Sequence, residues 1–164
     1  MSTAANIIKS SLDSSAYCIN AYLSDLSDAD LMVRPVPGIN HIAWQLGHLI
    51  NSEHELINKV CPGSMPALPD GFAAKYNKET AGLDDASKFD KKETFLRLMN
   101  EQRAGTVAAL AKVSDADLER ESPEGIRDYA PTVGATFALI GSHWMMHSGQ
   151  WVVVRRKLGH KAMF

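Results

Sequence analysis

The chain of 164 residues contains only two cysteines, Cys18 and Cys61, which are too few for a disulfide framework. It also lacks an excess of positive charge, because 17 lysines and arginines stand against 19 aspartates and glutamates. Without a positive field there is nothing to attract a polyanion, so nucleic acid is not an expected partner. We expect both cysteines to be free thiols without an identifiable role.

Long apolar runs are missing as well. No stretch approaches the roughly 18 apolar residues of a membrane span, and residues 1–15 lack the basic and apolar regions of a secretory signal. We therefore expect a cytoplasmic protein that does not bind membranes. The composition, 45% apolar and 22% charged, excludes disorder and collagen-like repeats. The length fits a single domain over residues 1–164.

Strand-like alternation is absent, and apolar residues instead recur at steps of three and four, as on one face of a helix. This spacing predicts four long helices, over residues 3–26, 41–60, 91–113 and 132–158. The last run is apolar on most sides, which indicates the most buried helix. Asn40 is expected to be the N-cap of the second helix.

Connections that contain proline and glycine separate these helices, at residues 27–39, 61–90 and 114–131. Short loops make neighbouring helices antiparallel, whereas a connection of about 30 residues can return along a whole helix. The second and third helices can then be parallel. We predict an all-α four-helix bundle in up-down-down-up order, with the long connection between helices two and three.

The pentapeptide SDADL occurs twice, at residues 27–31 and 114–118, each time after a predicted helix. Both copies have the S-x-x-D spacing of a helix N-cap. Two interpretations stay open for this repeat. It either caps two independent short turns or belongs to a helix-pair unit that the chain uses twice.

Three of the six histidines are candidates for one metal site. His143 and His147 are four residues apart in the predicted fourth helix, so they project from one face. His48 lies in an otherwise apolar or small part of the second helix. Taken alone, a histidine in the position of His48 is more often a core residue that is hydrogen-bonded to a carbonyl. An H-x-x-x-H pair alone also often occurs in proteins without a metal site. Together, three neutral imidazoles would bind one borderline cation and leave a position open for water or substrate.

The other histidines have less favourable positions. His41 shares the face of His48 but lies about 10 Å away along the helix axis, too far to join one coordination sphere. It either lines the mouth of such a site or has no role there. His54 is rotated away from His48 toward the expected surface. His160 follows the helix-ending Gly159 and is expected in the tail.

Several polar residues have both a functional and an ordinary interpretation. Glu55 lies on the same helix face as His48, two turns on, and Gln150 follows His147 by one turn. Each is either a hydrogen-bond acceptor for a metal-ligating imidazole or an unrelated polar residue. The basic run at residues 155–157 would attract a carboxylate-bearing substrate or simply complement the dipole at the end of a helix.

Residues 42–53 read I-x-W-x-x-x-H-L-I-x-x-E, and residues 143–150 read H-x-x-x-H-x-G-Q, with Leu-Gly at 158–159. With these motifs the whole chain resembles the DinB/YfiT superfamily in helix order and length. Members of that superfamily are up-down-down-up four-helix bundles that bind a divalent metal, so the resemblance implies the same here. It also implies the metal ligands, which are His48, His143 and His147.

Some relatives in this superfamily are thiol S-transferases or isomerases that use bacillithiol, mycothiol or glutathione. The resemblance therefore implies a metal-dependent transferase with a low-molecular-weight thiol as substrate. Zinc or nickel is the expected metal, with iron or manganese as alternatives. Two other functions stay open, namely a metal-dependent hydrolase and a non-catalytic metal-binding or stress-response bundle. We expect a homodimer.

Overall fold

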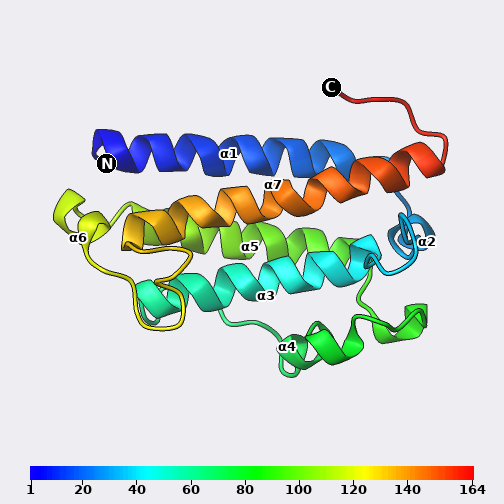
Figure 1. Cartoon of the computed structure of the whole chain (residues 1–164), viewed down its shortest axis with the longest axis horizontal. Coiled ribbons are helices and arrows are strands. Elements are labelled where there is room, and N and C mark those ends of the chain that lie inside the picture. Colours follow the sequence, from blue (N-terminus) through cyan, green and yellow to red (C-terminus); the bar gives the residue numbers. More distant parts are fainter.

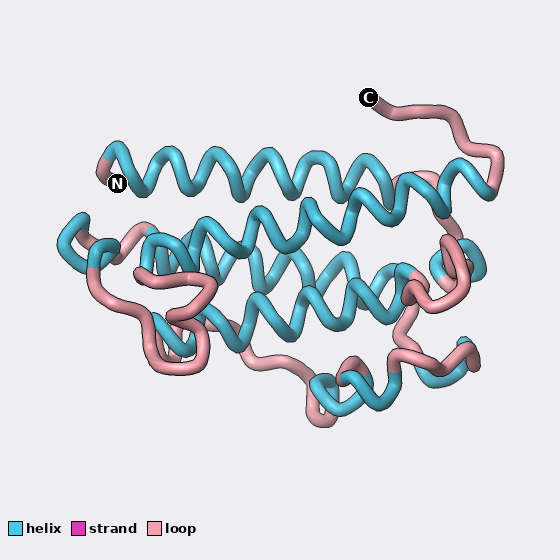
Figure 2. Tube along the Cα trace, in the orientation of Figure 1, coloured by secondary structure: helices cyan, strands magenta, loops and turns pink.

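The computed structural model describes residues 1–164 and contains helices and no strands. Four long helices lie side by side, as the ribbon and the tube both show (Figures 1 and 2). Their bounds are Thr3–Leu23 for α1, Ile42–Val60 for α3, Lys92–Leu110 for α5 and Val133–Lys157 for α7. The all-α prediction is confirmed, and each long helix begins within one residue of its predicted start.

The core lies between these four helices. α7 packs along α1 and α3, and α3 packs along α5. Two tryptophans of α7, Trp144 and Trp151, are among the largest fully buried side chains, together with Phe95 of α5 and Phe137 of α7. Burying a large apolar side chain contributes about 1.5–3 kcal/mol each. None of the helices combines the length and the apolar character that a bilayer crossing needs.

The two SDADL copies form the same local structure. Each begins a short helix, α2 (Asp28–Leu31) or α6 (Asp115–Glu119). In both, the serine hydroxyl accepts a hydrogen bond from the backbone N–H of the aspartate three residues on, and that carboxylate accepts one from the serine N–H. The predicted capping role is confirmed, and two regions predicted as loops therefore each contain one helical turn.

The N-cap of α3 is His41, so the prediction of Asn40 is wrong. Nδ1 of His41 accepts a hydrogen bond from the backbone N–H of Trp44 at 3.0 Å, and Nε2 donates to the carbonyl of Leu83 at 3.1 Å. The ring is fully buried against Phe89. Burial lowers the pKa of His41, which keeps Nδ1 unprotonated and available as the cap. His41 thus ties the long connection to the start of α3 and does not line the site's mouth.

Residues 61–90 are folded against α3 and contain three short helical turns. These are α4 (Phe72–Lys75), η1 (Lys78–Thr80) and η2 (Ala86–Lys88), which run beside α3 in Figure 1. The ring of Tyr76 occupies the space over Gly47 where any other residue would have its Cβ. The Tyr76 hydroxyl donates to the Asp90 carboxylate at 2.7 Å. A glycine in the middle of α3 therefore allows the connection to approach the helix closely.

An ion pair holds the C-terminal end of α7 to the end of α1. The guanidinium of Arg155 is almost fully buried and donates to the carboxylate of Asp25 and to the carbonyl of Tyr22. The Arg155 guanidinium holds the pKa of Asp25 well below its ordinary value of 3.8. Arg155, the first residue of the basic run at 155–157, therefore stabilises the packing of α7 against the end of α1.

We expect Asp25→Asn to lower the free energy of unfolding by about 1 kcal/mol at neutral pH, because solvent screens a half-exposed carboxylate. Asp25 has a depressed native pKa, so its stabilisation is complete above the unfolded-state pKa and is lost as the pH falls through the native one. The difference from wild type should therefore shrink between about pH 4 and pH 2. Urea denaturation across this range measures it, with Asp13→Asn at the exposed Lys9–Asp13 pair as control. A difference that does not change with pH would contradict the ion-pair origin.

Candidate metal centre

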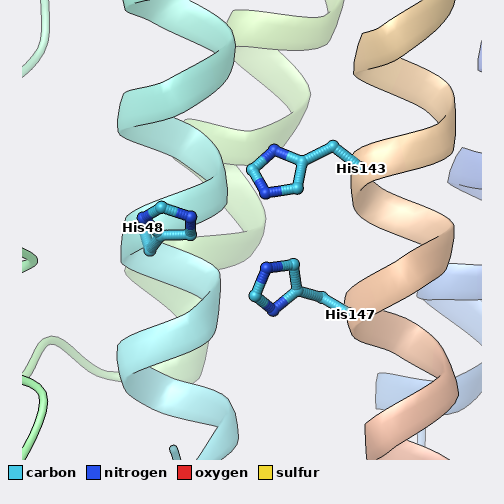
Figure 3. A group of neighbouring side chains, drawn as sticks. All are labelled: His48, His143 and His147. Atoms are coloured by element: carbon cyan, nitrogen blue, oxygen red, sulfur yellow. The ribbon is translucent and has the colours of Figure 1, made fainter. Parts of the chain in front are cut away.

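Three imidazoles from two helices meet between α3 and α7 (Figure 3). His48 comes from α3, whereas His143 and His147 come from successive turns of α7. Each histidine offers one ring nitrogen to the cluster, and these three nitrogens all lie within 4.8 Å of one another. The ring centroids are 5.0 to 5.4 Å apart. The structure thus brings together the three histidines that the sequence singled out.

The backbone and one aromatic contact position these rings. The four-residue spacing places His143 and His147 on the same face of α7. Trp44, one turn before His48 on α3, stacks on the His48 ring with a centroid distance of 5.1 Å and an interplanar angle of 6°. The Trp44 indole N–H donates to the carbonyl of Asn77 and to the hydroxyl of Thr80. The long connection therefore holds Trp44, which in turn supports His48.

The environment keeps all three imidazoles uncharged at neutral pH. Burial lowers the pKa of His48, and it lowers those of His143 and His147 to about 4, with the neighbouring imidazoles acting in the same direction. A neutral imidazole has one nitrogen with a free lone pair, which is the form that binds metal. The donor set of three neutral imidazoles fits a borderline divalent cation such as zinc or nickel.

A cavity of about 580 Å³ lies beside His48, between α3 and the α4 segment. The residues that line it include Trp44, Tyr76, Glu55 and Lys78. This volume is in the range of small-molecule sites, which are usually 300–1,000 Å³. A small molecule in this cavity would therefore lie against one of the three candidate ligands.

A family model described as the DinB superfamily matches residues 12–151, a range that includes all three histidines of the cluster. The chain belongs to the DinB superfamily.

A solved structure similar to this DinB chain is that of a conserved protein from Enterococcus faecalis, with a TM-score of 0.66. The two chains are 17% identical, and the match covers 95% of this chain and 96% of the other. At this identity the likeness shows a shared fold. No curated protein matches the chain.

The remaining histidines of this DinB-superfamily protein lie outside the cluster. His54 is turned away from it, but the expectation that His54 is a surface residue is wrong. It is half-buried, and its Nδ1 is 3.1 Å from the side-chain oxygen of Gln102 on α5. Nδ1 of His160 lies 3.0 Å from the Asp25 carboxylate, next to the ion pair of Asp25 with Arg155.

Neither Glu55 nor Gln150 is hydrogen-bonded to an imidazole of the cluster. Glu55 lines the cavity, and the side-chain oxygen of Gln150 accepts a hydrogen bond from Gln45 at 3.1 Å. The residue that hydrogen-bonds to the cluster is Gln45, whose Oε1 lies 3.0 Å from Nδ1 of His147. Sequence reasoning missed it, although a polar residue within the apolar run at 42–50 was an available signal.

The two cysteines form no disulfide, as expected. Cys61 is partly buried next to the end of α3, and this burial raises the pKa of its thiol. A thiol with a raised pKa is a poor nucleophile at neutral pH. Cys61 is therefore not a candidate nucleophile.

Proposed function

We propose that this DinB-superfamily protein binds one divalent metal ion through His48, His143 and His147 and uses it for reactions of a low-molecular-weight thiol. The observation that carries the proposal is the convergence of three neutral imidazole nitrogens within 4.8 Å of one another. Zinc and nickel suit such a donor set best, with iron and manganese as alternatives. Three protein ligands leave a coordination position open for the substrate.

His48, His143 and His147 would hold a divalent cation, whose Lewis acidity would lower the pKa of a thiol within reach so that its sulfur would be a thiolate at neutral pH. The three imidazoles hold the cation without adding charge, because burial keeps them neutral. Trp44 covers one face of the His48 ring, with a centroid distance of 5.1 Å. The cavity beside His48 accommodates the body of the thiol, where Glu55 and Lys78 offer one charge of each sign to its polar groups.

The proposal includes an up-down-down-up order of the four long helices within one domain over residues 1–164. The directions in Figure 1 support this order, since α1 and α7 run from left to right and α3 and α5 run from right to left. Contacts between α3 and α7 support it too, because Gln45 bonds to Trp151 whereas Glu53, further along α3, bonds to the earlier Trp144. Residues later in α3 thus pair with residues earlier in α7, as they do in antiparallel helices.

Metal removal should destabilise the protein. A metal present at 100 times its dissociation constant stabilises the folded state by about 2.7 kcal/mol, so a chelator should lower the melting temperature by roughly 5–10 °C. Metal analysis of the purified protein and calorimetry with and without chelator measure this effect. His48→Ala should neither bind the metal nor respond to the chelator. The control is His54→Ala, at a histidine of the same helix outside the cluster, and this variant should bind the metal and respond to the chelator as wild type does.

Thiol transfer is tested with monochlorobimane and a panel of bacillithiol, mycothiol, glutathione and cysteine. In this reaction the thiol sulfur forms a bond to the bimane carbon, chloride leaves with the electron pair of the carbon–chlorine bond, and the thiol proton goes to solvent. We expect metal-dependent turnover that His48→Ala abolishes and His54→Ala retains. Turnover that survives chelation would overturn the metal role. Bound metal without turnover of any thiol would overturn the transferase and leave a non-catalytic metal site.

A further inference from the structure

The side chain of Gln45 lies next to the histidine cluster and is only 1% exposed. Its Oε1 accepts hydrogen bonds from the indole N–H of Trp151 at 2.9 Å and from Nδ1 of His147 at 3.0 Å. Its Nε2 donates to the carbonyl of Asn40 and to the side-chain oxygen of Gln150. Both lone pairs of the oxygen and both protons of the nitrogen are therefore in use.

The partners of Gln45 determine which end of its amide faces His147. An indole N–H can only donate, so the atom next to Trp151 must be the oxygen. A carbonyl can only accept, so the atom next to Asn40 must be the NH₂ group. With an amide oxygen facing it, Nδ1 of His147 must carry the proton, because two lone pairs would repel each other. The free lone pair of His147 is then on Nε2.

We infer that Gln45 is a positioning residue, which holds His147 in the tautomer whose Nε2 lone pair faces the metal position. The inference rests on the proposed metal site. Figure 3 shows one ring nitrogen of His147 directed toward His143 and the other directed away, as this role requires. Ligating histidines commonly donate their second N–H to a protein acceptor, which fixes both the tautomer and the ring orientation.

The anchoring of Gln45 explains why it can impose a tautomer on His147. Trp151 is fully buried on α7, one turn after His147, and Asn40 precedes α3, so the amide is held both from α7 and from the segment before α3. Rotating the amide would place its NH₂ group against the indole N–H and leave buried donors without acceptors, which costs about 1–3 kcal/mol for each group. Gln45 therefore stays in one orientation whether or not a metal is bound.

The test compares Gln45→Met with Gln102→Met. Gln102 is also a completely buried glutamine that hydrogen-bonds to a histidine, but its partner is His54, outside the cluster. Both substitutions remove a buried amide of the same size, so they control for the loss of stability. We expect Gln45→Met to weaken Zn²⁺ binding by about 10–100-fold, as is usual for the loss of such a hydrogen bond, and Gln102→Met to leave it unchanged.

Zn²⁺ affinity is measured by competition with a chromophoric chelator, and urea denaturation confirms that each variant is folded. The tautomer is measured on metal-free protein by ¹⁵N NMR of the imidazole nitrogens. We expect His147 to carry its proton on Nδ1 in wild type and in Gln102→Met, and a mixture of tautomers in Gln45→Met. Equal Zn²⁺ affinities of the two methionine variants, or a proton on Nε2 in wild type, would overturn the inference. Wild-type protein that binds no metal would overturn the proposed function, while the NMR measurement still decides the role of Gln45.

Discussion

Glu53→Ala should lower the free energy of unfolding by about 3–5 kcal/mol, the usual cost of removing one partner of a buried ion pair. Glu53 is 1% exposed in the middle of the bundle, and its carboxylate accepts two hydrogen bonds from Arg103 at 3.0 and 3.2 Å. It also accepts one from the hydroxyl of Thr106 and one from the indole of Trp144, each at 2.7 Å. The substitution leaves the Arg103 charge and two further donors without their acceptor.

The matched control is Glu101→Ala, at an ion pair of similar length on the surface. Glu101 accepts from Arg97 at 2.9 Å, but both side chains are about half exposed. Pairs of this kind contribute about 0–1 kcal/mol. Urea denaturation of both variants measures the difference. Similar losses in the two would mean that water reaches Glu53 and that the network does not hold the bundle together.

The Glu53 network also connects three of the long helices. Glu53 lies on α3, Arg103 and Thr106 on α5, and Trp144 on α7, one residue after a candidate metal ligand. Through Trp144, the network sets the register of α7 against α3 close to the histidine cluster. Glu53→Ala should therefore weaken metal binding as well as stability, whereas Glu101→Ala should change neither.

The long helices are predictable from the sequence because their apolar spacing reports the face that each helix buries. The same pattern does not predict where each helix ends, because the helix ends depend on local capping and packing contacts. α1 ends at Leu23, although the apolar spacing continues to Leu26, which is buried after the helix has ended. At the start of α3, the imidazole of His41 displaces the expected Asn40 as cap, because it bonds to the long connection at the same time.

The histidine cluster is predictable in part because two of its members share one helix face at a fixed spacing. Gln45 could not be assigned in this way, since its partners His147 and Trp151 are more than a hundred positions away in the sequence. The fold of residues 61–90 was missed for a similar reason. It depends on long-range contacts that have no periodic signature, such as those of Tyr76 with the backbone at Gly47 and of Trp44 with Asn77.

Gly47→Ala tests this contact and should lower the free energy of unfolding by about 3 kcal/mol, at the upper end of the usual cost of overpacking. A Cβ at position 47 would lie well inside 3.0 Å of three ring carbons of Tyr76. The ring cannot yield easily, because Tyr76 is 2% exposed and its hydroxyl is bonded to Asp90. The preference of a helix for alanine over glycine, about 1 kcal/mol, offsets only part of this cost.

Gly149→Ala provides the matched control, because Gly149 is also in the interior of a long helix but a Cβ there would meet nothing within 4 Å. This variant should gain up to about 1 kcal/mol from helix propensity alone. Tyr76 also forms a wall of the cavity beside His48, so Gly47→Ala should raise the KM for a thiol while the metal affinity stays near that of wild type. Denaturation, thiol kinetics and chelator competition measure the three effects. Equal stabilities of the two alanine variants would mean that the Tyr76 segment moves away from α3 at no cost, and the cavity would then not be a fixed feature of the fold.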